Sequence, residues 1–202
     1  MTGTPPLFGR LLWVALIVGT GACSTTVERV DSDKQRDLSG DWNDTDSRLV
    51  SEAMINELMD GPWLQNYRRA HDSIPTVIVG TVNNLSHEHI NTRTFINDME
   101  RALINSGKIT FVASRAERDE VREERRDQDT HAREETRSRM GQETGADFML
   151  KGSISSIMDV EGRRQVRYYQ IDLTLIDLES THKVWLGQKK IKKFVSKASV
   201  RP

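Results

Sequence analysis

The side chains best suited to chemistry in this 202-residue sequence are a pair of histidines, a few neighbouring carboxylates and a single cysteine. Only His87-Glu88-His89 brings two imidazoles close together. In a strand both rings would share one face and could bind a metal ion with a third ligand. We expect the cluster in a loop before a helix, with no adjoining third ligand, so the sequence predicts no metal site.

The remaining polar residues do not form a recognisable catalytic motif. The sequence contains no nucleophile elbow, P-loop, dinucleotide fingerprint or HExxH pair. Asp44 and Asp46 are more simply explained as helix-capping residues. Asp172, Asp177 and Glu179 fit strand-surface and turn positions. We therefore predict no catalytic residue and no cofactor. An enzymatic function is a third alternative, for which the sequence identifies no site.

Cys23 is the only cysteine, which excludes an intrachain disulfide and multi-cysteine zinc or iron–sulfur sites. Before it come Arg10, the unbroken apolar run Leu11–Val18 and the small residues Gly19-Thr20-Gly21-Ala22. The apolar run is shorter than the roughly 20 residues of a spanning helix. This pattern predicts a secretory signal peptide.

Small residues that lead directly into a cysteine resemble the bacterial lipobox. The resemblance implies a lipoprotein signal peptide at residues 1–22 and lipid on Cys23, although Thr20 stands where that motif usually has leucine. Ser24, in place of aspartate, implies the outer membrane, facing the periplasm. Two or more acyl chains would anchor the protein stably. The alternative is an ordinary signal peptide followed by an incidental cysteine.

The rest of the sequence has the composition of a soluble domain that follows a polar segment. Its 29 basic and 30 acidic residues argue against bulk electrostatic binding to nucleic acid. Residues 23–41 are polar and predict a flexible periplasmic tether, with a reach of about 60 Å at roughly 3.4 Å per residue. We place one globular domain at 42–193 and a C-terminal tail at 194–202.

Periodicity predicts an α/β (α+β) fold. A helix begins near Asn43, with a stripe that includes Leu49, and Gly61-Pro62 ends it. The residues that follow, with Trp63 and Tyr67, are expected to form a connection. Strands at 74–82 and 109–113 flank a second helix and predict a parallel βαβ unit. Strands at 147–158, 165–178 and 183–192 predict an antiparallel meander. The expected architecture is a single mixed β-sheet with helices packed mainly on one face.

Residues 115–139 are densely charged, with alternating signs. The pattern predicts one or two solvated helices with i,i+4 ion pairs. The alternative is an arm that docks on a partner.

Several segments follow one another in a characteristic order: Asp37–Val50, Val79–Val82, Glu88–Thr92, Glu100–Lys108, Phe111–Ser114, Gly145–Gly152, Tyr168–Leu178 and Lys183–Lys189. Together they resemble the penicillin-binding protein activator LpoB family. The resemblance implies an outer-membrane lipoprotein that is not an enzyme. It also implies a partner, a bifunctional class A penicillin-binding protein whose glycan polymerisation and peptide cross-linking the protein stimulates. Better-known family members have a long proline-rich tether, whereas this one is short.

The contact surface is expected on polar residues at the start of the first helix and on the wet face of the meander. The candidates are Asn43, Asp44, Arg48, Lys151, Ser153, Tyr168, Gln170 and Asp172. An exposed tyrosine is a plausible hot-spot residue, although strand propensity alone also explains Tyr168. We expect a monomer that does not bind nucleic acid. The alternative function is an accessory component of an outer-membrane export system of the curli-secretion type.

Overall fold

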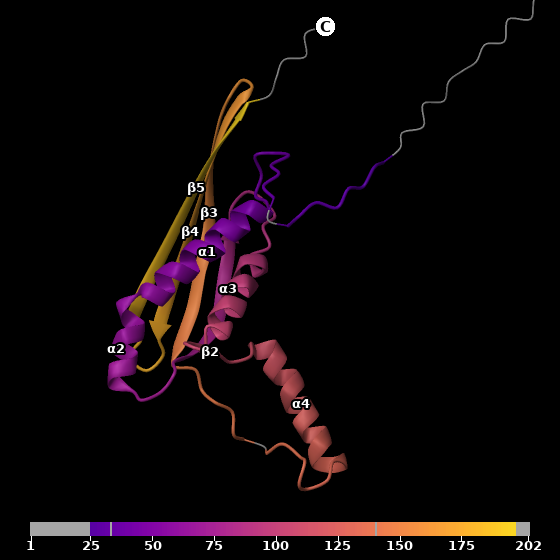
Figure 1. Ribbon diagram of the computed structural model, residues 1–202, viewed down its shortest axis with the longest axis vertical. Helices are drawn as coiled ribbons and strands as arrows, with labels where there is room; N and C mark the ends of the chain where they lie inside the picture. Colours follow the sequence, from indigo (N-terminus) through magenta and orange to yellow (C-terminus); the bar gives the residue numbers. More distant parts are fainter. Residues whose placement is uncertain (1–24, 33, 140, 197–202) are drawn as a thin grey trace, which may run out of the picture. The chain divides into compact units, whose positions relative to one another are not determined.

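The computed structural model describes residues 25–32, 34–139 and 141–196. The predicted signal peptide, Cys23 and residues 197–202 of the predicted tail lie outside the described residues. The chain divides into two compact units, one that ends at Lys34 and one that begins at Gln35. The second unit contains a five-stranded sheet in the order β2-β1-β3-β4-β5 (Figure 1).

Helix α1 (Asp44–Asp60) begins with a capping box. The Asn43 side chain accepts a hydrogen bond from the Asp46 backbone N–H at 3.1 Å, and the Asp46 carboxylate accepts from the Asn43 N–H at 2.9 Å. Both bonds satisfy amides that have no partner within the helix. The stripe through Val50, Met54 and Leu58 is buried as expected, but Leu49 faces solvent.

A second helix, α2 (Pro62–Ala70), occupies residues that the sequence analysis assigned to a connection. That assignment was wrong because Gly61-Pro62 ends α1 and also starts α2, since proline suits the first helical turn. Trp63 is buried, and its indole N–H donates to the Leu58 carbonyl at 2.8 Å.

The βαβ unit is confirmed. Strand β1 (Thr76–Leu85) pairs in parallel with the two-residue β2 (Thr110–Phe111), and α3 (Arg93–Asn105) connects them. Phe95, Ile96 and Met99 of α3 are buried, whereas Ile104 at its end is half exposed.

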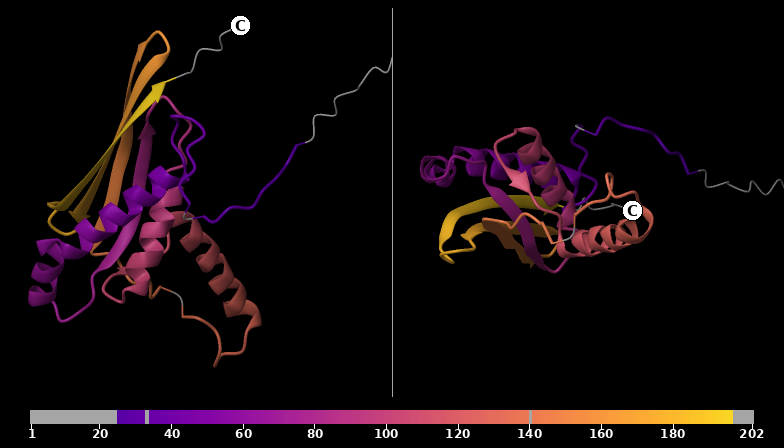
Figure 2. Two further views of the ribbon diagram at one scale, coloured as in Figure 1. Left: turned by 45° about the horizontal axis from the view of Figure 1, so that its top comes forward. Right: turned by 90° about the horizontal axis from the view of Figure 1, so that it is seen from below.

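The antiparallel meander is also confirmed, with strands β3 (Phe148–Glu161), β4 (Arg164–Asp177) and β5 (Lys183–Ser196). Strand β3 additionally pairs in parallel with β1, which makes the sheet mixed. Alternate β4 residues Tyr169, Ile171, Leu173 and Leu175 are buried. Helices α1 and α3 lie over this face (Figure 2), so the opposite face is left open.

Helix α4 (Arg115–His131) has no buried residue and leads away from the sheet in Figure 1. Ser114 and Glu117 cap its first turn. Arg122 binds the Glu143 carboxylate with two N–H groups, each at 2.8 Å, which ties the helix to the segment before β3. The charged segment is therefore a solvated helix laced with ion pairs, as its pattern predicts.

Both boundaries of the folded unit lie outside the predicted limits of 42 and 193. Gly40 is buried against Val195, and the carbonyl of Asp41 accepts a hydrogen bond from Lys193 at 2.9 Å. Strand β5 continues to Ser196. The last residues assigned to the tether thus pack on the end of the meander.

Candidate functional site

The open face of the sheet carries a ladder of polar side chains on β4. The Tyr168 hydroxyl donates to Gln170 at 3.1 Å, and the Gln170 amide donates to Asp172 at 2.8 Å. Gln188 of β5 donates to the other Asp172 oxygen at 2.6 Å. These bonds hold three of the predicted contact residues in one row, with their orientations set by their neighbours.

Lys151 and Ser153 lie beside this row on β3. In the register of the two strands, Ser153 is opposite Asp172 and Lys151 is opposite Thr174. Directly opposite residues of an antiparallel pair share a face. The structure therefore brings together five of the eight predicted contact residues, Lys151, Ser153, Tyr168, Gln170 and Asp172.

The other three predicted contact residues lie elsewhere. Asn43 caps α1, Asp44 is exposed in its first turn, and Arg48 pairs with Glu52 at 3.1 Å along the helix. Helix α1 covers the opposite face of the sheet from the polar ladder, so the eight residues do not form one continuous surface. The side chain of Asn43 bonds both Asp46 and Asp37, which gives it a structural function.

A cluster that the sequence analysis missed lies where the chain joins the sheet. The Glu88 carboxylate accepts hydrogen bonds from the Trp42 N–H at 2.9 Å, the Tyr169 hydroxyl at 2.5 Å and Arg167 at 2.8 Å. Arg167 also pairs with Asp41. We call these five residues the Glu88 cluster. Tyr169 lies 81 residues after Glu88 along the chain and Arg167 lies 79 residues after it, so no local spacing in the sequence identifies the cluster.

The Glu88 cluster is closely packed around Tyr169. The rings of Trp42 and Tyr169 meet edge to face, with centroids 5.5 Å apart. Burial, followed by the hydrogen bond to Glu88, raises the pKa of the Tyr169 hydroxyl far above its ordinary value. The middle residue of His87-Glu88-His89 therefore joins the first segment of the folded unit to β4.

A second ion pair strengthens the same junction. The Lys193 ammonium lies 2.5 Å from the Asp46 carboxylate, and the two side chains are 16% and 4% exposed. A pair this well shielded from water is screened less than a surface pair. Lys193 thus holds together helix α1, β5 and the segment before α1, and the sequence analysis considered Asp46 only as a capping residue.

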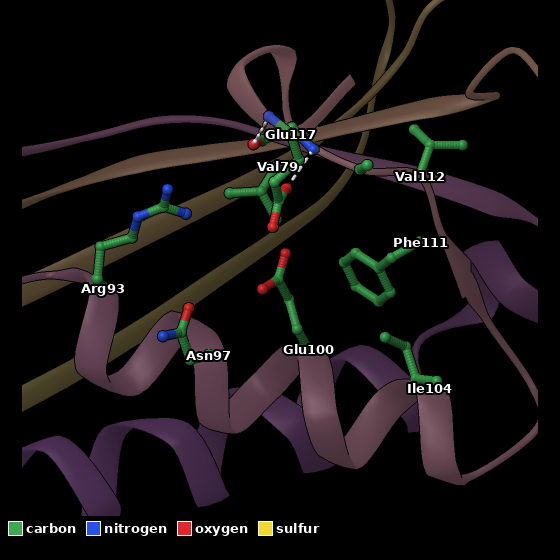
Figure 3. A pocket seen from close by; sticks show the side chains of 10 residues that line it. Val79, Arg93, Asn97, Glu100, Ile104, Phe111, Val112 and Glu117 are labelled. Carbon is green, nitrogen blue, oxygen red and sulfur yellow. Dashed lines mark hydrogen bonds between the residues drawn. The ribbon is translucent and has the colours of Figure 1, made fainter. Parts of the chain in front are cut away.

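A hollow of about 420 Å³ lies between α3, β2 and the start of α4. Figure 3 shows the carboxylates of Glu100 and Glu117 facing each other, with Phe111 beside them. Burial raises the pKa of Glu100, and the charge of Glu117 raises it further. Hydrogen bonds from Ser114 lower the pKa of Glu117, which is the capping residue of α4. Capping therefore explains one of the two carboxylates.

Within the described ranges, no group of three histidine, cysteine or acidic side chains is placed to hold a metal ion. In the same part of the chain, no helix combines the length and apolar character needed to cross a bilayer. Cys23, the predicted lipidation site, precedes the described residues.

The fold and its surfaces define a small α/β domain with one sheet face under helices and one polar face open to solvent. A family model described as peptidoglycan-synthase activator LpoB matches residues 46–191, from the first turn of α1 into β5. The match covers well over half of the chain, which therefore belongs to the LpoB family. The comparison with curated protein sequences found no match.

Solved structures similar to this chain include the lipoprotein GNA1162 of Neisseria meningitidis, with 15% identity and a TM-score of 0.39 over 62% of this chain and 88% of that one. The C-terminal domain of LpoB from Escherichia coli has 17% identity and a TM-score of 0.36 over 71% of this chain and 98% of that one. The corresponding domain from Salmonella enterica has 17% identity and a TM-score of 0.33 over 65% and 94% of the two chains.

Proposed function

We propose that this protein is an outer-membrane lipoprotein that binds and activates a bifunctional class A penicillin-binding protein in peptidoglycan synthesis. The observation that carries the proposal is the family match across residues 46–191, which includes both faces of the sheet. The protein acts as a regulator, and the chemistry belongs to the synthase.

The proposed contact surface is the polar ladder on the open face, Tyr168, Gln170 and Asp172, with Lys151 and Ser153 beside it. Mutual hydrogen bonds hold the ladder side chains in place before binding, so less conformational entropy is lost on contact. An activator of this kind works by binding the active state of the synthase more tightly than the resting state. Its stimulation is limited by that difference in affinity.

The binding part of this proposal is tested with the mature protein and each class A synthase of the same organism. We expect a complex whose affinity falls about tenfold or more in Tyr168→Ala, since an aromatic hot spot is worth roughly 2 kcal/mol. The matched control is Val121→Ala, an exposed apolar residue of α4, which lies off the sheet. If no synthase binds, or if both variants bind like the wild type, the proposed surface is wrong.

The anchor is proposed separately, on the sequence of residues 10–24. We expect mass spectrometry of the protein from membranes to find an N-terminal Cys23 that carries lipid. Cys23→Ser should leave the protein unlipidated and release it from the membrane fraction. An intact thiol on Cys23 in the mature protein would contradict the anchor.

A further inference from the structure

The end of the meander beyond the helices carries an exposed apolar patch on the open face. Strands β3, β4 and β5 extend past α1 and α3 in Figure 1, and the last five residues of β3 are exposed. In the sheet register, Ile157 is opposite Tyr168, and Asp159, Val166 and Phe194 form the next row. Ile157 is 65% exposed and Phe194 is 67% exposed. We call Ile157, Val166 and Phe194 the meander patch.

Basic side chains outnumber acidic ones around the meander patch. Arg164, Lys190 and Lys192 lie on the same face by alternation, against Asp159 and Glu161. Among the described residues, none of the three basic side chains has an ion-pair partner. Arg163 lies in the adjoining turn between β3 and β4. Apolar side chains within an excess of basic ones suit the interface of an anionic phospholipid bilayer.

The chain also joins the folded unit at this end of the sheet. Gln35, Asp37 and Leu38 line one hollow together with Phe194 and Val195 of β5. The tether proper is therefore only residues 24–34, with a maximum reach of about 40 Å at roughly 3.4 Å per residue. A lipid on Cys23 would keep the meander patch close to the membrane surface.

We propose that the meander patch rests on the anionic phospholipid surface to which the protein is anchored. In this orientation the opposite end of the domain, which contains α2, points away from the membrane. The inference rests on the proposed lipid anchor at Cys23. Because the anchor holds the patch at a high effective concentration near the bilayer, even a weak interfacial affinity is enough to orient the domain. Tyr168 lies at the border between the meander patch and the polar ladder.

The test uses the full mature lipoprotein in vesicles that contain phosphatidylglycerol and phosphatidylethanolamine. Lipid caps Cys23, so a cysteine introduced by Ile157→Cys or Phe194→Cys is the only free thiol and takes an environment-sensitive fluorophore. Both residues are exposed, so the label does not disturb the core. Leu186→Cys is the matched control, since Leu186 is 66% exposed on the same face but far from the patch.

We expect brominated lipids to quench the labels at 157 and 194 at least threefold more strongly than the label at 186. Lys190→Glu with Lys192→Glu, or high salt, should reduce that quenching at least twofold, because both weaken attraction to anionic lipid. Equal quenching at all three positions, or shielding at 157 that appears only when a synthase is added, would overturn the proposal. The latter result would make the patch a protein-binding surface.

The outcomes separate this proposal from the proposed function. A lipidated protein that stimulates a synthase but shows no selective quenching would contradict only the proposed membrane contact. A mature protein without lipid on Cys23 would contradict both the proposed anchor and the proposed membrane contact. Selective quenching without stimulation of any synthase supports the membrane contact and contradicts the activator function.

Discussion

Glu88 is the residue on which the junction between the first folded segment and the sheet depends. Its carboxylate accepts three hydrogen bonds, from Trp42, Tyr169 and Arg167. Removing an acceptor of this kind leaves polar groups without a partner in a partly buried site, which lowers the free energy of unfolding. The residue belongs to the Glu88–Thr92 segment by which the sequence resembles its family, so stability accounts for at least part of that motif.

We expect Glu88→Ala to lower the free energy of unfolding by about 3 kcal/mol, because Arg167 and the Tyr169 hydroxyl lose their shared acceptor. Urea denaturation measures the change. Glu52→Ala is the control, since Glu52 makes only a surface pair with Arg48 and should change stability by no more than about 0.5 kcal/mol. Equal effects of the two substitutions would mean that the Glu88 cluster does not stabilise the fold.

Tyr169 makes the same cluster sensitive to alkaline pH. Burial raises its pKa above the ordinary value of 10.0, so the folded state keeps the neutral hydroxyl while the unfolded chain ionises near pH 10. The unfolded state then binds fewer protons, and stability falls as pH rises above about 10. We expect this fall to be shallower in Tyr169→Phe than in the wild type or in Tyr168→Phe, as measured by thermal unfolding between pH 8 and about pH 11. Parallel curves for all three proteins would contradict the assignment.

Alternation in the sequence was sufficient to separate Tyr168 from Tyr169. Tyr168 is half-buried on the open face of the sheet and Tyr169 is buried in the core, as a period of two requires. The Glu88 cluster could not be found in the same way, because Asp41, Glu88 and Arg167 meet only through the tertiary fold. Asn43 was taken for a contact residue, although its type at a helix start also fits the cap that it forms.

At the scale of the elements, hydrophobic periodicity identified α1, α3 and the strands that build the sheet. The second helix was missed because proline was interpreted only as a stop signal. Pro62 occupies the first turn of α2, where its missing N–H costs nothing. The parallel pairing of β3 with β1 depends on contacts distant in sequence, which local patterns do not specify.

Gly152 controls how closely β3 and β4 approach each other. A Cβ atom at this position would lie 2.1 Å from the Asp172 carbonyl oxygen and 2.7 Å from the Leu173 side chain. We expect Gly152→Ala to lower the free energy of unfolding by about 2 kcal/mol, because the two strands must move apart. Gly145→Ala is the control, since nothing lies within 4 Å of its Cβ position. If chemical denaturation gives both variants the same free energy of unfolding as the wild type, the strands can shift apart without loss of stability.

At the scale of the whole molecule, the proposed tether sets how far the domain can reach, whereas activation depends on the domain alone. Deletion of residues 25–30 shortens the maximum reach by about 20 Å at roughly 3.4 Å per residue. We expect the shortened lipoprotein to stimulate a detergent-solubilised synthase normally but to lose function in cells, measured by complementation of a strain that lacks the protein. Replacement of the same six residues by a Gly/Ser sequence of equal length should retain both activities. Full complementation by the deletion would mean that the tether does not limit reach.

The central claim is that this domain activates a peptidoglycan synthase by binding it directly. The measurement that tests it most directly is the rate of glycan-chain synthesis from lipid-linked precursor by the organism's class A synthases, with and without the purified mature protein. We predict a several-fold rise with one of these synthases and a rise at least twofold smaller with Tyr168→Ala at the same protein concentration. An unchanged rate with every class A synthase of the organism would contradict the account.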